Sequence, residues 1–239
     1  MSIIRESENL QAPARVEENH PVYTLLLHLS VWLTWPVMAA CLFFPAVDLF
    51  ARGWAWALPL LLLLGILLSD FTSGLFHWFF DNYGSPQTPV FGPTIELFRV
   101  HHDLPEDICH SNLVFTVGHV CIWILPMGLG MGGLWAVLPK SLFTDLGLIF
   151  AATAALFLVL TNLFHQWAHR PQKPIWMLFL QQKRLILETQ HHQVHHTPPF
   201  AKYYCITTGW MNPFLHKIQF FHRLEQFLAR LGIAKSADV

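Results

Sequence analysis

Residues 54–81 read WAWALPLLLLLGILLSDFTSGLFHWFFD, an apolar run that ends among polar side chains. About 20 apolar residues in a helix cross a bilayer, so the run predicts a membrane span from about Trp54 to Phe80. Asp70, His77 and Asp81 are spaced so that they share one helical face. A carboxylate inside a span is energetically costly and is a candidate for a functional role. The stretch therefore predicts a membrane helix with a functional site at one end.

Three further stretches are long and apolar enough to span a bilayer, at about residues 23–50, 113–138 and 142–168. Short links join the first span to the second and the third to the fourth, so we expect two helical hairpins. We predict an all-α integral membrane protein with four transmembrane helices arranged as two hairpins. A polar N-terminal segment, residues 1–22, precedes a single membrane domain over residues 23–239.

The composition of the chain agrees with a membrane protein. Of its 239 residues, 54% are hydrophobic and 12% are charged, whereas a typical soluble domain has about 25% charged residues. The net charge of -1 lacks the basic excess of a nucleic-acid-binding protein. We therefore expect no nucleic-acid partner. The four cysteines are far apart and have neither a zinc-binding nor a disulfide-framework spacing.

The basic residues predict an orientation. The two short links contain only Arg52 and Lys140, whereas the N-terminal segment, the longer link 81–112 and the tail 170–239 contain the others. The positive-inside rule places this second set, and both termini, in the cytoplasm. We expect a multi-pass protein of a bacterial inner membrane or an ER-type membrane, with a cytoplasmic His-rich cap that binds metal.

Histidines gather where the spans end. The chain has 15 histidines against 14 Lys and Arg, and most lie in RVHHDLP (99–105), TNLFHQWAH (161–169) and HHQVHH (191–196). The predicted topology brings these motifs and His77 to one membrane face. Spacings of three and four residues place helical side chains next to each other, and neutral imidazole is a common ligand of Fe, Zn and Cu. An exposed His-rich turn would explain HHQVHH alone, but not this convergence.

The number of candidate ligands suggests two metal ions, because a closed site takes about four protein ligands. Ligating histidines usually donate their second N–H to a carboxylate, so Asp70 and Asp81 are interpreted as partners of ligands or as ligands themselves. His110 and His119 are left undecided. Imidazole ligands alone do not select iron over zinc. The eight predicted ligands are His77, His101, His102, His165, His169, His192, His195 and His196.

Five motifs in series resemble those of the Kua-type lipid desaturases, which include plasmanylethanolamine desaturases and a plant plastid phosphatidylglycerol trans-3 desaturase. The eight histidines match the family's histidine positions, and His191 matches some members. One departure follows the HHxxP element, where ICHSNLVFTVGH (108–119) replaces an I-T-R run, so His110 or His119 is a candidate replacement ligand. The motifs are DFTSGLFHWFFDNYG (70–84), FRVHHDLP (98–105), TNLFHQWAH (161–169), QHHQVHHTPP (190–199) and YYCITTGWMNPFL (203–215).

The resemblance implies a non-haem di-iron centre, O₂ as oxidant and electrons from an external carrier such as cytochrome b5 or ferredoxin. It implies that a C=C bond is introduced into an acyl or alkyl chain of a membrane phospholipid. The reaction would be vinyl-ether formation, as in plasmalogens, or desaturation of a phosphatidylglycerol acyl chain. Candidates for holding the headgroup at the interface are Lys202, Tyr203, Tyr204 and Trp210, which lie in the basic and aromatic tail.

Three other functions compete with a desaturase. A membrane hydroxylase would use the same iron centre, and only product analysis separates the two. A membrane zinc hydrolase would need a general-base carboxylate beside its ligands, as in an HExxH helix, and the sequence has no such motif. A bis-histidine haem protein would need histidines at mid-bilayer depth on facing helices, whereas these lie near the predicted span ends.

Overall fold

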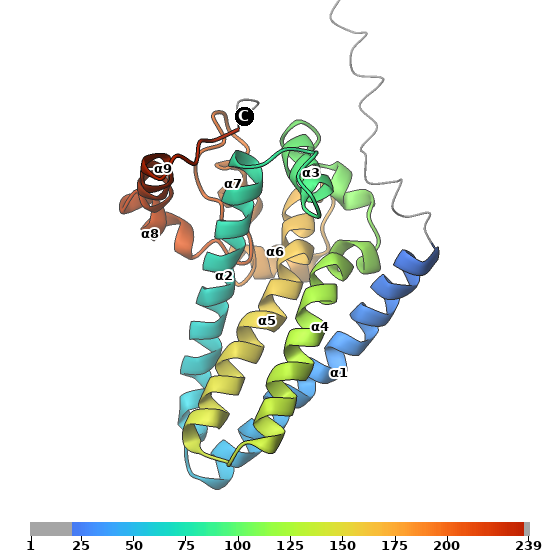
Figure 1. Ribbon diagram of the computed structural model, residues 1–239, viewed down its shortest axis with the longest axis vertical. Helices are drawn as coiled ribbons and strands as arrows, with labels where there is room; N and C mark the ends of the chain where they lie inside the picture. The colour runs from blue at the N-terminus through green and yellow to red at the C-terminus, as the bar shows by residue number, and fades with distance from the viewer. Residues whose placement is uncertain (1–20, 237–239) are drawn as a thin grey trace, which may run out of the picture.

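The computed structural model describes residues 21–236, and no strand occurs among them. Four long helices form the body of the molecule (Figure 1), and each is long and apolar enough to cross a membrane. This confirms the prediction of an all-α protein with four candidate spans. Residues 1–20 of the expected polar segment lie outside the described residues. The four helices are α1 (Pro21–Ala51), α2 (Leu58–Asn82, preceded by the short helix η3, Ala55–Ala57), α4 (Leu113–Val137) and α5 (Leu142–His169).

Helix α5 is the central span, because it packs against α1, α2 and α4. A short link joins α1 to α2, yet α1 packs mainly against α4 and α5, and α2 mainly against α5. Small residues allow the close approach of α2 and α5: a Cβ atom added to Gly65 would lie 2.6 Å from the Cβ of Thr153. The outer faces of the spans expose large apolar side chains such as Trp32, Phe43 and Trp123, as a lipid-facing surface requires.

A buried carboxylate with two partners lies at one end of the bundle. Asp145, in the first turn of α5, lies 3.4 Å from the Nε of Arg52 and accepts a hydrogen bond of 2.9 Å from the indole N–H of Trp135. Ser141 caps the same helix through a reciprocal capping box with Thr144. These contacts tie the link after α1 to α4 and α5.

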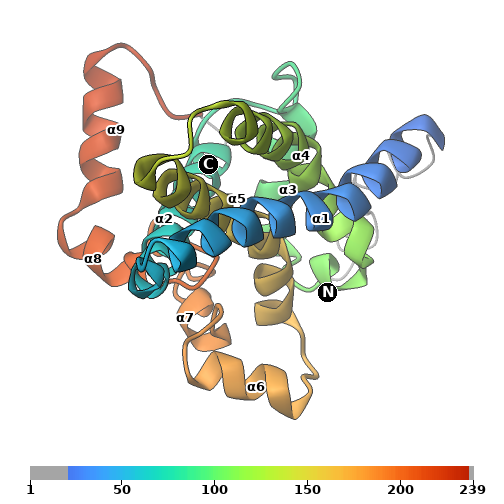
Figure 2. The same ribbon diagram turned by 90° about the horizontal axis from the view of Figure 1, so that it is seen from below.

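The opposite end carries a cap of shorter helices (Figure 1). The link between α2 and α4 contributes two of them, and the tail after α5 contributes four. Helix α6 lies across the direction of the spans (Figure 2) and exposes Ile175 (85% exposed), Trp176 and Phe179, a pattern that suits a helix lying in a membrane interface. The cap helices are α3 (Gly92–Asp103), η4 (Asp107–His110), α6 (Ile175–Gln182), α7 (Thr189–Gln193), α8 (Met211–Lys217) and α9 (Phe220–Arg230).

Candidate metal centre

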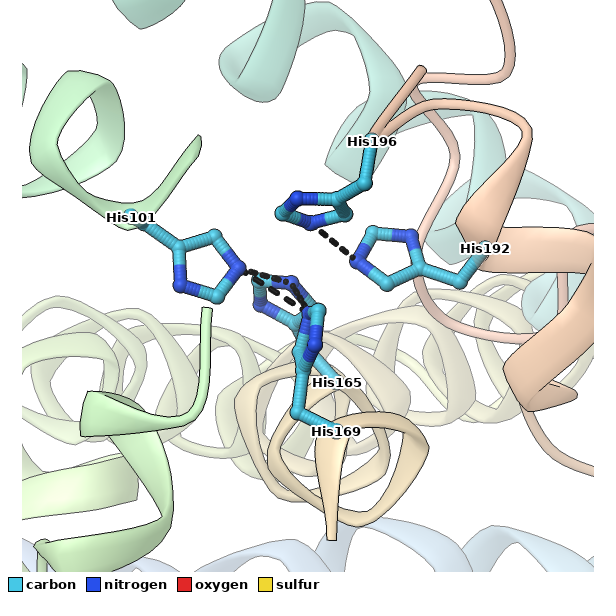
Figure 3. Close-up of side chains that lie close together, drawn as sticks. All are labelled: His101, His165, His169, His192 and His196. Atoms are coloured by element: carbon cyan, nitrogen blue, oxygen red, sulfur yellow. Dashed lines mark hydrogen bonds between the residues drawn. The ribbon is translucent and has the colours of Figure 1, made fainter. Parts of the chain in front are cut away.

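Nine side chains of the metal-binding type converge at the junction of the spans and the cap, in two groups. Within each group the candidate ligand atoms lie within 4.8 Å of one another. All eight histidines predicted as ligands are present, together with Asp81. Group 1 consists of His101, His165, His169, His192 and His196 (Figure 3), and group 2 consists of His77, Asp81, His102 and His195.

Neighbouring histidines on the same element supply different groups. His101 and His102 end helix α3, and they belong to group 1 and group 2, respectively. In the segment that begins with α7, His192 and His196 belong to group 1, whereas His195 belongs to group 2. Successive helical residues point about 100° apart, so one short segment can serve two adjoining sites. The two groups therefore share α3 and the segment that begins with α7, and they are structurally coupled.

The ring nitrogens of group 1 are close together (Figure 3). The Nε2 atom of His101 lies 3.0 Å from the Nε2 atoms of both His165 and His169, which are 3.2 Å from each other. The Nε2 atoms of His192 and His196 are 3.1 Å apart. Nitrogen ligands at about 2.1 Å from one ion and at right angles to each other would be about 3 Å apart. The donor spacing of group 1 therefore fits a single metal ion.

Group 2 contains a carboxylate in place of further imidazoles. The Oδ2 atom of Asp81 lies 3.5 Å from the Nε2 atoms of His77 and His195 and 3.6 Å from that of His102. Asp81 is 2% exposed, and neither carboxylate oxygen has a hydrogen-bond partner among the described residues. A buried carboxylate without a partner is costly, and a cation bound between these four side chains would remove that cost. Asp81 is thus positioned as a candidate ligand.

Backbone carbonyls orient two rings of group 2. The Nδ1 atom of His77 lies 3.1 Å from the carbonyl oxygen of Tyr204, and the Nδ1 atom of His195 lies 2.9 Å from that of Lys202. A carbonyl can only accept, so each Nδ1 carries the hydrogen. The lone pair of each Nε2 then faces the centre of group 2, which is the tautomer that a metal ligand needs.

Three of the predicted ligands in the cap, His102, His195 and His196, are held in the neutral form. Burial lowers the pKa of His102 to about 4. It lowers the pKa of His195 to about 3 and that of His196 to about 2, with a further contribution from neighbouring imidazoles. These rings are therefore unprotonated at neutral pH, the state in which imidazole binds metals.

Asp70 has a different role from the one that the sequence suggested. Its carboxylate lies outside both groups and accepts hydrogen bonds from the backbone N–H groups of Thr208, Gly209 (both 2.8 Å) and Met211 (2.9 Å). This corrects the interpretation of Asp70 as a partner of a ligand. Asp70 instead holds the segment that follows Tyr204, whose carbonyl orients His77.

The remaining histidine candidates belong to neither group. His191 lies next to a group 1 residue, but its Nε2 is 3.1 Å from the Nδ2 of Asn212 and its ring stacks on Tyr203 at 4.7 Å. His110 is exposed beside Asp107. The ring of His119 lies 5.9 Å from that of Tyr23. The structure therefore places neither His110 nor His119 where a missing ligand would be.

The four headgroup candidates are dispersed. Tyr204 is 1% exposed, so its ring is not available to a headgroup, and the prediction for this residue is wrong. Lys202 and Tyr203 line one hollow. Trp210 lines another, together with Arg184 and Glu188, and its indole N–H donates to the carbonyl of Arg184 at 2.6 Å. The buried position of Tyr204 follows from contacts with α2, which a motif alone does not reveal.

The fold and the site define the class of protein. It is an all-helical membrane protein with four apolar spans and a buried, His-rich cluster of the metal-binding type. Residues 66–237 match the model of the lipid desaturase domain. The chain belongs to the lipid desaturase family, which confirms the resemblance found in its motifs.

Individual relatives agree with this assignment. The chain is 40% identical over 178 residues to the plasmanylethanolamine desaturase of Myxococcus xanthus (72% of this chain, 61% of that one). It is 36% identical over 171 residues to plasmanylethanolamine desaturase 1 of Mus musculus (70% and 63%). It is 32% identical over 176 residues to the chloroplastic fatty acid desaturase 4 of Arabidopsis thaliana (71% and 51%). The chain thus spans 51 to 63% of the length of these relatives. No solved structure matches it.

Proposed function

We propose that this protein is an O₂-dependent, non-haem di-iron lipid desaturase that introduces a C=C bond into an acyl or alkyl chain of a membrane phospholipid. The observation that carries the proposal is the convergence of eight histidines and Asp81 into two adjoining groups at one end of four apolar spans. The names of the relatives narrow the proposed reaction to vinyl-ether formation in an ethanolamine lipid or desaturation of a fatty acyl chain.

In the proposed site, group 1 holds one iron ion and group 2 holds the other. The bound ions would supply the reduction of O₂, which side chains alone cannot perform. The overall reaction converts one CH₂–CH₂ unit, O₂, two electrons and two protons into CH=CH and two molecules of water. The two hydrogens lost by the lipid chain and the two protons from solvent account for the hydrogens of the water.

The chain's own residues position and protect the reactants. The buried, neutral imidazoles present lone pairs to the ions, and the carbonyls of Lys202 and Tyr204 fix two of these rings. Asp70 anchors the segment that follows Tyr204. Such fixed geometry matters because an unactivated methylene reacts only when it is held next to the oxidant. The apolar spans would guide the lipid tail to this position.

We place the lipid headgroup in the hollow lined by Arg184, Glu188 and Trp210. The hollow follows α6, whose exposed Ile175 and Trp176 suit a membrane interface. A guanidinium group suits a phosphate, and a carboxylate suits an amine. The Nε of Arg184 lies 3.7 Å from the Oε2 of Glu188. A zwitterionic headgroup would replace this contact by pairing its phosphate with Arg184 and its amine with Glu188. The excess of basic residues on this side supports a cytoplasmic active site and cytoplasmic termini.

A comparison of adjacent histidines tests the proposal. His192→Ala removes a group 1 residue, whereas His191→Ala removes a ring that lies outside both groups. We expect purified wild-type protein and the His191 variant to retain two iron ions per chain, and the His192 variant to lose iron and activity. His165→Ala should behave like His192→Ala. Full iron content and activity in His192→Ala would refute the assigned site.

Product analysis separates the desaturase from the related hydroxylase. Mass spectrometry of lipids from cells with and without this chain should detect a product lighter than its precursor by two hydrogens. A product heavier by one oxygen would instead assign the protein as a hydroxylase.

A further inference from the structure

We propose that an acidic one-electron carrier protein docks on the exposed surface above group 2. This surface, called the donor face here, is centred on the hollow lined by Lys202, His216 and His222, and it includes the exposed chain neighbours Lys217 at the end of α8 and Arg223 on α9. The inference rests on the proposed function, because each desaturation takes two electrons from an external carrier.

The loop beneath the donor face contacts group 2 directly. The carbonyl of Lys202 accepts the Nδ1–H of His195, and the ring of Phe200 stacks on that of His102 with centroids 4.6 Å apart and planes inclined by 5°. Lys202 is exposed and Phe200 is half-buried. A single layer of chain therefore separates solvent from two members of group 2. Electron transfer slows steeply with distance, so a carrier on this loop would be well placed to reduce the proposed ions.

The chain segment that forms the donor face carries charges of one sign. The sequence contains no Asp or Glu between Glu188 and Glu225, but it contains Lys202, Lys217 and Arg223, all of which are exposed. Glu225 itself is engaged by the indole N–H of Trp78 at 3.0 Å and by Lys235 at 2.7 Å. A surface with an excess of positive charge attracts and orients an oppositely charged partner. The complementary carrier is therefore acidic.

The donor face is also hollowed. Lys202, Tyr203, His216 and His222 line a cavity whose wall includes the buried Leu215. A cationic rim around an apolar wall can receive an acidic side chain of a partner and bury apolar surface beside it, as at other protein interfaces. The hollow joins the loop over group 2 to α8 and α9, so one partner can contact all parts of the donor face.

Binding of two purified carriers tests the proposal without requiring turnover. The probes are the soluble domain of cytochrome b5 and a [2Fe–2S] ferredoxin, titrated against the full chain in phosphatidylcholine vesicles. We expect Lys217→Glu and Arg223→Glu each to raise Kd at least fivefold for the carrier that binds, and wild-type affinity to fall as salt rises. The matched control is Lys183→Glu, which makes the same charge change at the end of α6 and should leave Kd unchanged.

Turnover with two reductants distinguishes docking from other roles of this surface. With dithionite, a small reductant that needs no docking site, Lys217→Glu and Arg223→Glu should turn over lipid at the wild-type rate. With the reduced carrier they should be slower at subsaturating carrier concentrations.

Three results would overturn the inference. The first is an equal Kd in all variants, and the second is a wild-type protein that binds neither carrier. The third is an equal loss of turnover with both reductants, which would assign the donor face to anionic lipid. Loss of turnover in the wild type with dithionite would instead refute the proposed function, while the binding data would still decide the docking.

Discussion

Asp145 and Asp81 are buried carboxylates at opposite ends of the same helical bundle, and their surroundings differ. Asp145 has an arginine at 3.4 Å and an indole donor at 2.9 Å. Asp81 faces three imidazole nitrogens at 3.5 to 3.6 Å and has no hydrogen-bond partner among the described residues. The first carboxylate has a cationic partner within the protein, whereas a bound cation would supply the one that the second lacks. The comparison indicates that one end of the bundle is held by an ion pair and that the other end has the side chains to hold a metal ion.

Substitution of Asp81 is the strongest test of this difference between the two ends of the bundle. We expect Asp81→Ala to reduce iron content and to lower activity by about 10- to 100-fold or more, because a proposed ligand is lost. The matched control is Asp103→Ala, which removes an exposed carboxylate next to His102 but outside both groups and should retain its iron. Metal analysis and lipid turnover measure both effects. An Asp81 variant with normal iron content would show that group 2 does not depend on its carboxylate.

Removal of the metal should destabilise the end that contains Asp81. A ligand that binds only the folded state stabilises it by about 4 kcal/mol when it is present at 1,000 times its Kd. We therefore expect chelation to lower the Tm of the wild-type protein and to have less effect on Asp81→Ala. Differential scanning calorimetry in detergent measures the difference. Equal shifts in the two proteins would contradict a metal role for Asp81.

Asp70 provides an intermediate case, a buried carboxylate whose partners are backbone N–H groups. Asp70→Ala leaves the N–H groups of Thr208, Gly209 and Met211 without their acceptor, and each buried unsatisfied group costs about 1–3 kcal/mol. We expect a loss of a few kcal/mol in the free energy of unfolding and weaker iron binding. Asp70→Asn, which retains one acceptor oxygen, should lose less. Identical unfolding curves for Asp70→Ala and the wild type would remove Asp70 from this role.

The smallest effect should come from Asp145. Asp145→Asn retains an acceptor for Trp135 but loses the charge that faces Arg52, a partly exposed partner. We expect a loss of about 1 kcal/mol or less in stability, with iron content and dithionite-driven turnover unchanged. Thermal unfolding and metal analysis of the same preparation test this. A loss of iron would show that the two ends of the bundle are not independent.

The sequence predicts the features that depend on local pattern. The four spans follow from uninterrupted apolar runs, and the eight histidines stand out because such clusters are rare in an apolar chain. Their gathering at one end follows from topology, since His77 and His165 lie near the ends of spans that meet the cap.

Features that depend on distant contacts could not be predicted in this way. The partners of Asp70 are backbone groups more than a hundred residues away, and no pattern in residues 69–81 points to them. The burial of Tyr204 depends on α2 and α9, which pack around it. The assignment of His101 and His102 to different groups depends on the orientation of α3, which spacing alone leaves open. These details arise from packing and not from local sequence.

The division of His101 and His102 between the groups has a consequence for how the site would fill. The Cα atoms of consecutive residues are about 3.8 Å apart, so the distance between the two proposed ions is tied to the length of one peptide unit. An ion entering group 1 would immobilise His101 and thereby pre-orient His102 for group 2. Loading of the two irons should therefore be cooperative, with singly loaded protein scarce during titration.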